Sequence, residues 1–225
     1  MSDSKPSNLI DGKKIAQTIQ KEIKEKIAFE NIQPCLATVL VGERKDSQTY
    51  VRMKRKLAKE LGILSKDVNL PEDTTQEKLI EEVDALNNDK SVNGILVQLP
   101  LPKHIDEEAV LQRIAPLKDV DGFHDVNIGR LAMKGRIPQF VPCTPSGCLE
   151  LLLRSNVEIE GKNAVVIGRS NIVGIPMSLL LLEKNATVTI CHSRTKDLPE
   201  IVKRADIVVA AIGKAHFLTA QMIKP

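Results

Sequence analysis

Apolar residues repeat along this chain with two alternating periods. A stripe at every fourth position indicates an amphipathic helix in residues 15–27. Short apolar runs at 36–41 and 94–97 are typical of buried strands, and helical patterns at 47–61 and 76–86 lie between and beside them. Helices that alternate with buried strands predict an α/β fold with parallel strand pairing.

A turn-rich stretch interrupts this alternation between residues 116 and 145. It contains the segments KDVDGFHDVN and GRIPQFVPCTP, which are rich in residues that favour turns. A helical pattern follows at 146–154, and a second strand–helix rhythm begins at residue 162. We therefore predict two α/β domains, residues 1–140 and 141–225, the second a Rossmann-like parallel sheet that is truncated at its C-terminal end.

One lysine of the predicted helix 47–61 lies in an apolar sector. On a wheel of about 100° per residue with Tyr50 at zero, Lys54 falls at roughly 40°. The apolar side chains of the same sector are Met53, Leu57, Ala58 and Leu61. An inward lysine either snorkels out to water or sits in a low-dielectric site, where it can act as a general base near neutral pH. Tyr50, one turn before Lys54, is within reach of the amine and favours the second interpretation.

Composition narrows the class of function. The chain has 32 basic and 29 acidic residues, four phenylalanines, one tyrosine and no tryptophan, which is too balanced and too poor in stacking groups for a nucleic-acid partner. No apolar stretch reaches the roughly 20 residues of a membrane span, and the start lacks a signal-peptide core, so we predict a cytoplasmic protein without a membrane partner. The spacing of the four cysteines and four histidines predicts free thiols and no metal site.

The second domain contains a candidate phosphate loop. The sequence GRSNIVG follows the predicted strand 164–167, is bounded by Gly168 and Gly174, and precedes a helix in which Pro176 suits the first turn. Glycines let the backbone approach a phosphate, and a helix N-terminus offers free N–H groups to hold it. The spacing is not G-x-G-x-x-G, so a packing turn that binds no ligand is the alternative.

The end of the next predicted strand, 187–190, indicates which dinucleotide the loop would bind. Enzymes of this class that use NAD usually carry an acidic residue there, whereas this chain has Ser193 and Arg194. A hydroxyl and a guanidinium favour a 2′-phosphate, and Arg169 inside the loop offers a second positive charge. The sequence therefore predicts NADP rather than NAD, with residues 205–213 as the third strand of this domain.

Five motifs occur in order along the chain: Y-V-x-x-K-x-K at 50–56, G-I-L-V-Q-L-P-L-P at 94–102, K-D-V-D-G-F at 118–123, P-C-T-P-x-G at 142–147, and G-R-S-x-I-V-G-x-P at 168–176. Together they resemble the bifunctional methylenetetrahydrofolate dehydrogenase/methenyltetrahydrofolate cyclohydrolase family of one-carbon metabolism. The resemblance implies that a nicotinamide cofactor takes a hydride from 5,10-methylenetetrahydrofolate and that the methenyl product is hydrolysed in the same cleft to 10-formyltetrahydrofolate. It also implies a homodimer formed through the second domain.

The resemblance assigns roles to individual residues. The catalytic residues would be Lys54, Tyr50 and Gln98. The residues that contact the tetrahydrofolate substrate would be Tyr50, Gln98, Leu99, Pro100 and Asp121. From the loop, the strand ends and their charges, rather than from the resemblance, the residues predicted to bind the cofactor are Gly168, Arg169, Ser170, Gly174, Pro176, Ser193, Arg194 and Gly213. Gln98 follows a predicted strand, at the edge where open α/β sheets bind ligands. Asp121 suits the two donors of an aminopyrimidinone edge, and an Asx turn in DVDG is its alternative role.

The chain departs from the family pattern at two places. Residues 44–47 read R-K-D-S where relatives commonly have D-P-A-S. The chain stops at residue 225, where the family continues into another strand, a P-G-G-V-G-P segment and a final helix. We interpret the ending as that of a truncated or partly represented version, or of a complete but impaired protein. Two other functions stay open: a catalytically impaired folate-binding relative, and a Rossmann-type dehydrogenase of another small substrate.

Overall fold

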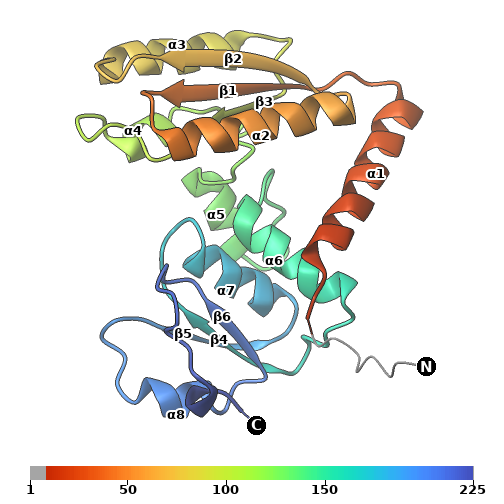
Figure 1. The fold of residues 1–225 in the computed structure, drawn as a ribbon, viewed down its shortest axis with the longest axis vertical. Helices are drawn as coiled ribbons and strands as arrows, with labels where there is room; N and C mark the ends of the chain where they lie inside the picture. The colour runs from red at the N-terminus through yellow and green to blue at the C-terminus, as the bar shows by residue number, and fades with distance from the viewer. Residues whose placement is uncertain (1–8, 225) are drawn as a thin grey trace. The chain divides into compact units, whose positions relative to one another are not determined.

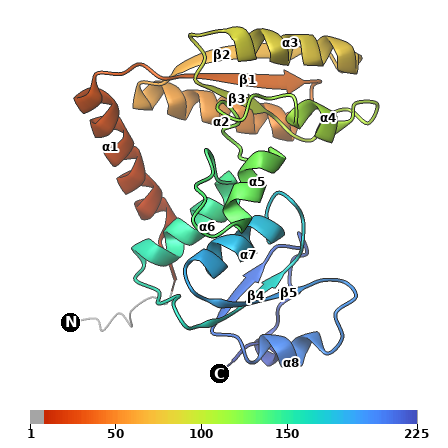
Figure 2. The same ribbon diagram turned by 180° about the vertical axis from the view of Figure 1, so that it is seen from behind.

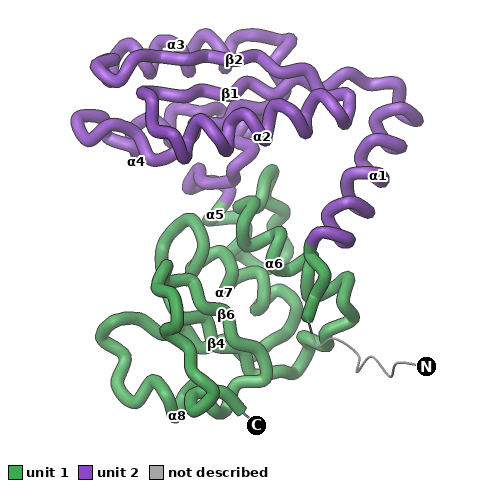
Figure 3. The backbone as a smooth tube through the Cα atoms, viewed as in Figure 1, with its two compact units in different colours: residues 1–12, 128–225 green, residues 13–127 purple. Residues whose placement is uncertain are grey.

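The computed structural model describes residues 9–224, which form two compact units. The N-terminal unit comprises residues 13–127 (unit 2 in Figure 3). The C-terminal unit comprises the described residues from 128 onward, together with those before residue 13 (unit 1 in Figure 3). The structure therefore divides the chain inside helix α5 (Asp125–Ala132), earlier than the boundary at residue 140 that the sequence predicts.

The N-terminal unit is built on a three-stranded parallel sheet in the order β2-β1-β3 (Figure 1). The central strand β1 (Cys35–Val41) is buried along almost its whole length, as is the short edge strand β3 (Gly94–Val97). Strand β2 (Leu64–Leu70) forms the other edge and is largely exposed. The parallel pairing predicted from the alternation of strands and helices is confirmed.

Helices cover both faces of this sheet. Helix α3 (Gln76–Asn88) and the short helix α4 (Glu107–Leu111) pack on one face, where their apolar residues share a core with alternate residues of β1 and β3. Helix α2 (Lys45–Leu61) lies on the opposite face, against β1 and β2 (Figure 1). The predicted helical stripe lies in α1 (Gly12–Glu30), which has no buried side chain. The Thr75 hydroxyl caps α3 by accepting from the backbone N–H of Lys78.

The C-terminal unit repeats the same strand order in a second parallel sheet. Strand β4 (Asn163–Ile167) lies between β5 (Thr187–Cys191) and β6 (Ile207–Ala210). This arrangement confirms a Rossmann-like parallel sheet, although the third strand is shorter than the predicted 205–213.

Two helices cover one face of this second sheet. Helices α6 (Cys143–Arg154) and α7 (Gly174–Glu183) contribute to a core with β4 and β6. Helix α8 (Leu198–Val202) packs on the other face (Figure 2). The 3₁₀ turn η1 (Ala220–Met222) lies against α8 and contributes to the same core. Among the helices within residues 9–224, none combines the length and apolar character that a membrane span requires.

The structure corrects the prediction of an irregular connection between residues 116 and 145. Helix α5 occupies part of that stretch, and α6 begins at Cys143, three residues before the predicted helix start at 146. The turn-forming residues around both helices concealed them, because Gly, Pro and Asp are also common just outside helix ends.

Candidate functional site

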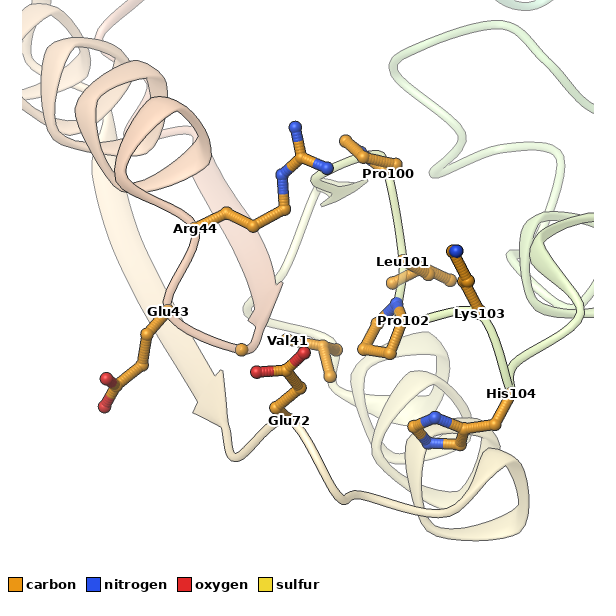
Figure 4. Close-up of a pocket in the computed structure, with 10 residues that line it drawn as sticks. Val41, Glu43, Arg44, Glu72, Pro100, Leu101, Pro102, Lys103 and His104 are labelled. Atoms are coloured by element: carbon orange, nitrogen blue, oxygen red, sulfur yellow. The ribbon is translucent and has the colours of Figure 1, made fainter.

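The first candidate site lies at the carboxyl edge of the N-terminal sheet. In the strand order β2-β1-β3, the chain passes from β1 to β2 on one side and later reaches β3 on the opposite side of β1. The topological switch point of the sheet therefore lies between β1 and β3. A hollow of about 440 Å³ opens where the chain leaves these strands (Figure 4). Its lining residues are Val41, Gly42, Glu43, Arg44, Glu72, Pro100, Leu101, Pro102, Lys103 and His104. Figure 4 shows the Arg44 side chain extending toward Pro100, while Val41 and Leu101, which are buried, lie beside Pro102.

Lys54 is held by a side chain from the end of β3. Its Nζ donates a hydrogen bond of 3.2 Å to Oε1 of Gln98, and both residues are half-buried. Gln98 is fixed in turn, because its Nε2 donates to the Leu99 carbonyl at 2.7 Å and its backbone N–H donates to Val39 at 2.9 Å. The structure thus brings together two of the predicted catalytic residues from α2 and β3.

The buried face of α2 differs in part from the predicted one. Ser47, Val51, Ala58 and Leu61 are its buried residues. They lie near roughly 65° on the wheel used above, so Lys54 at about 40° falls within the buried sector. Met53, predicted to lie in the apolar sector, is 62% exposed, and Tyr50, predicted to reach the Lys54 amine, is 61% exposed. Within residues 9–224 no hydrogen bond links the Tyr50 hydroxyl to the Lys54 amine, so Gln98 is the partner that holds it.

Asp121 lies in the turn that follows residue 118 and is half-buried. Burial raises the pKa of its carboxyl group to about 6; the positive charge of Lys54 lowers this pKa and the negative charge of Asp119 raises it. None of the residues that the structure describes donates a hydrogen bond to the Asp121 carboxylate. The carboxylate is therefore free to accept hydrogen bonds from a ligand.

The turn role that the sequence left open for Asp121 belongs to Asp119. The Asp119 carboxylate accepts hydrogen bonds from the backbone N–H groups of Gly122 and His124, at 3.1 and 2.9 Å. The sequence signal was present, because DVDG predicts an Asx turn, but two aspartates compete for that role. Asp119 therefore forms the Asx turn, and the Asp121 carboxylate is not used by the turn.

The two remaining substrate-contact candidates follow Gln98 directly. Leu99 is half-buried and packs against the apolar core of the N-terminal unit. Pro100 is exposed and lines the hollow described above. The candidate substrate residues therefore run from the end of β3 into the hollow at the carboxyl edge.

The second candidate site is the loop between β4 and α7 in the C-terminal unit. Gly168 has φ 125°, and a side chain there would collide with the carbonyl oxygen of Ala211. A side chain at Gly174 would collide with the carbonyl of Gly168. The N–H of Gly168 also donates to the Cys191 carbonyl at 2.8 Å, which ties the loop to the end of β5. Both glycines are therefore required by the close packing of this loop.

Ser170 and Pro176 shape the start of α7. The Ser170 hydroxyl accepts hydrogen bonds from the N–H groups of Val173 and Gly174, at 3.2 and 3.3 Å. Pro176 is buried in the first turn of the helix, as predicted from its fixed φ. Ser170 therefore closes the loop upon the helix start and satisfies N–H groups there.

Positively charged side chains lie beside this loop without partners. Arg169, Ser193 and Arg194 are exposed, and within residues 9–224 their side chains form no ion pair or hydrogen bond, although the Arg194 backbone N–H donates to Nδ1 of His192 at 3.2 Å. Gly213, with φ 62°, follows β6 at the same carboxyl edge of the sheet. An anionic ligand would meet two unneutralised guanidinium groups beside the positive end of α7. The free N–H groups that the sequence predicts at this helix start are occupied instead, by the Ser170 hydroxyl and, for Ile175, by the Ser170 carbonyl at 3.0 Å.

Two family models match most of the chain. Residues 10–121 match the catalytic domain of tetrahydrofolate dehydrogenase/cyclohydrolase, and residues 142–225 match the NAD(P)-binding domain of the same family.

Relatives and solved structures agree with these models. The chain is 58% identical over 228 residues to bifunctional protein FolD 2 of Arabidopsis thaliana, covering all of this chain and 76% of the relative. The crystal structure of the bifunctional FolD enzyme from Campylobacter jejuni superposes with a TM-score of 0.91 at 45% identity, over 96% of this chain and 77% of that one. FolD of Trypanosoma brucei, solved with NADP cofactor and an inhibitor, gives a TM-score of 0.91 at 46% identity, over 96% and 75% of the two chains.

Proposed function

Because this chain belongs to the tetrahydrofolate dehydrogenase/cyclohydrolase family, we propose that it carries both activities. It oxidises 5,10-methylenetetrahydrofolate to the methenyl form with NADP, and it hydrolyses the methenyl form to 10-formyltetrahydrofolate. The family resemblance seen in the five motifs is confirmed by the family models. The observation that carries the activity is the Lys54–Gln98 hydrogen bond at the switch point of the sheet, because it holds a proton-transfer group where open α/β sheets bind ligands.

The roles of the residues follow from their chemistry. Lys54 is the group that moves a proton at its Nζ, and Gln98 orients that amine through Oε1. The free Asp121 carboxylate accepts from the amino and ring N–H donors of the pterin. Leu99 and Pro100 form an apolar wall for the ring system, and Tyr50, exposed one turn from Lys54, offers an aromatic face to the same ligand.

The C-terminal unit supplies the residues that fit NADP. The glycine-restricted loop, the start of α7 and Gly213 suit a pyrophosphate, and Arg169, Ser193 and Arg194 suit a 2′-phosphate. When bound, NADP accepts the hydride that leaves the methylene carbon. The relative from Trypanosoma brucei, solved with NADP, supports this choice of cofactor.

One measurement tests the proposed activities. The purified chain is supplied with 5,10-methylenetetrahydrofolate and either NADP or NAD, and the absorbance of the methenyl product is followed. We expect turnover that saturates with folate and is faster with NADP. Folate binding without turnover would favour an impaired folate-binding relative, and cofactor binding without folate saturation would favour a dehydrogenase of another small substrate.

We further propose that the chain forms a homodimer through its C-terminal unit. Met133, Ile137 and Leu182 are 57%, 85% and 58% exposed and border a hollow of about 620 Å³ between the segment after α5 and helix α7. Exposed apolar side chains gathered around a hollow are typical of protein interfaces. Light scattering of the parent and of Ile137→Asp tests this surface, since the substitution should shift a dimer toward monomer.

The cytoplasm remains the proposed compartment, and residues 1–140 and 141–225 remain the proposed folate and NADP domains. All four cysteines are free thiols, which supports a reducing environment. The gap between the two family models, residues 122–141, supports a domain join in that stretch.

A further inference from the structure

Asp119 is a buried carboxylate whose hydrogen bonds all come from its own turn and from α5. Only 1% of the surface of Asp119 is exposed. Besides the two backbone donors described above, its Oδ2 accepts from Nδ2 of Asn127 at 3.0 Å. No lysine or arginine among the described residues forms an ion pair with it. A buried negative charge is costly unless hydrogen bonds satisfy it, so these three donors fix the turn firmly.

The Asp119 turn is also fastened to the strand that presents Gln98. Asp119 pairs with Ile95 in an isolated parallel bridge, and the Ile95 N–H donates to the Lys118 carbonyl at 2.7 Å. Gly94 makes room for this contact, because a side chain there would collide with Val120. Three residues after Ile95 the same strand leads to Gln98.

Lys118, which directly precedes Asp119, anchors the start of the turn to helix α3. Lys118 Nζ donates to the carbonyls of Leu86, Asn87 and Asp89 at 2.9, 2.8 and 2.7 Å, and so caps the C-terminus of α3. The backbone before Asp121 is therefore held at α3, at β3 and at the start of α5.

We propose that Asp119 is a positioning residue for substrate binding, whose buried, hydrogen-bonded carboxylate holds Asp121 in the geometry that accepts the pterin donors. This inference rests on the proposed role of Asp121 in folate binding. It also assigns an electrostatic influence, because two charged groups act on Asp121: Lys54 from α2 and Asp119 from the same turn. The Asp119 charge raises the pKa of Asp121, whereas that of Lys54 lowers it.

The test is folate binding as a function of pH in the full chain, measured by calorimetry. Asp119→Asn keeps the side-chain volume but puts an amide where His124 and Asn127 donate to Oδ2. We expect affinity near pH 7.5 to fall by about three- to thirtyfold because the turn loosens. We also expect the midpoint of the pH dependence to move to lower pH, because a neighbouring negative charge has been removed. A role in folding alone would leave this midpoint in place.

The swap Asp119→Asn with Asn127→Asp is the second variant. It restores a donor–acceptor pair in the reverse sense and moves the charge from residue 119 to residue 127. We expect it to recover much of the affinity while its pH midpoint stays below that of the parent. If circular dichroism shows that Asp119→Asn alone does not fold, the pH midpoint of folate binding is measured on this double variant instead.

Two further variants separate this inference from the proposed function. If Asp121→Ala binds folate as tightly as the parent, the role of Asp121 itself is wrong. If Asp121→Ala binds weakly, Asp119→Asn combined with Asp121→Ala should bind no more weakly than Asp121→Ala alone, because both substitutions act through one contact. Additive losses, or an unchanged pH midpoint in the folded Asp119 variants, would overturn the inference for Asp119. Because Asp121→Asn has no carboxyl group at residue 121, any pH dependence of folate binding that it keeps comes from the ligand and is subtracted.

Discussion

At the scale of single residues, neighbouring lysines on one helix have different environments. Lys54 is half-buried and donates to Gln98, whereas Lys56 is exposed and lies 3.9 Å from Glu60 on the surface. The wheel separates the two because Lys54 falls in the buried sector and Lys56 on the opposite side. The hydrogen bond to Gln98 could not be read from the wheel, since residue 98 is 44 positions away in sequence.

We predict that Lys54→Met lowers the rate of methenyltetrahydrofolate hydrolysis by about two to four powers of ten, the range lost with a proton-transfer group. Folate binding and thermal unfolding should change little, because methionine fills the same half-buried space. Hydrolysis is followed by the loss of methenyl absorbance. Lys56→Met is the matched control and should keep the parent rate. Equal hydrolysis by Lys54→Met and the parent would remove Lys54 from the mechanism.

Asp121 gives a prediction about pH. Its pKa of about 6 means that the carboxylate is largely protonated at pH 5 and largely ionised above pH 7. The ionised form accepts two hydrogen bonds, so folate affinity should rise with pH through about 6 and then level off. Calorimetry from pH 5 to pH 8 measures this rise. Asp121→Asn should abolish the pH dependence, and Asp121→Ala should weaken binding near pH 7.5 by roughly one to two powers of ten. A flat profile in the parent would contradict this assignment.

The same shift affects folding. The folded protein holds the Asp121 proton more tightly than the unfolded chain does, so this group stabilises the fold most at low pH. Its contribution is lost as the pH rises from about 4 to about 6. Denaturant unfolding of the parent and of Asp121→Asn at both pH values would separate this effect from the other carboxylates.

At the scale of elements, the sequence predicted those that are buried and regular. The strand at 94–97 and the helix ending at residue 61 were found as expected, since continuous apolar runs and Gly62 mark them. Strand β2 (Leu64–Leu70) was not predicted, because it is an exposed edge in which polar residues predominate. Helices α4 and α5 are too short for a periodic pattern to distinguish them from turns.

The loop before α7 gives a prediction about backbone packing. A methyl group at Gly174 would meet the carbonyl of Gly168 and the N–H of Arg169, neither of which can move without opening the loop. Gly174→Ala should therefore destabilise the protein by about 1 to 3 kcal/mol, the usual cost of overpacking. It should also weaken NADP binding about tenfold or more, because the proposed phosphate site uses the same backbone.

Gly129→Ala is the control for that substitution. Gly129 lies in α5 with open space around its Cα, so a methyl group there should be neutral or slightly stabilising. Thermal unfolding and fluorescence titration with NADP measure both variants. Unchanged NADP binding by Gly174→Ala would mean that the loop packs α7 against the sheet and does not bind phosphate.

At the scale of the whole molecule, two parallel sheets of the same strand order carry different chemistry. Each has its candidate site at the carboxyl edge, but the N-terminal unit presents an amine, an amide and a carboxylate, whereas the C-terminal unit presents glycines and arginines. Hydrolysis of the methenyl group needs no redox cofactor, and oxidation does. The two activities should therefore respond to substitutions in different units.

Arg194→Glu tests this separation together with the choice of cofactor. Replacing the guanidinium with a carboxylate puts a negative charge where the 2′-phosphate would lie, so the preference for NADP over NAD should fall by about tenfold or more. Raising the salt concentration should weaken binding of NADP by the parent more than binding of NAD, because salt screens the exposed Arg194 charge. Hydrolysis of supplied methenyltetrahydrofolate should stay at the parent rate, since the residues proposed for this reaction all belong to the N-terminal unit. Lys196→Glu makes the same charge change two residues away, at an exposed position, and should alter the preference far less. A parent chain that prefers NAD at low salt would refute the charge argument, and a parallel loss of hydrolysis in Arg194→Glu would refute the separation of the two activities.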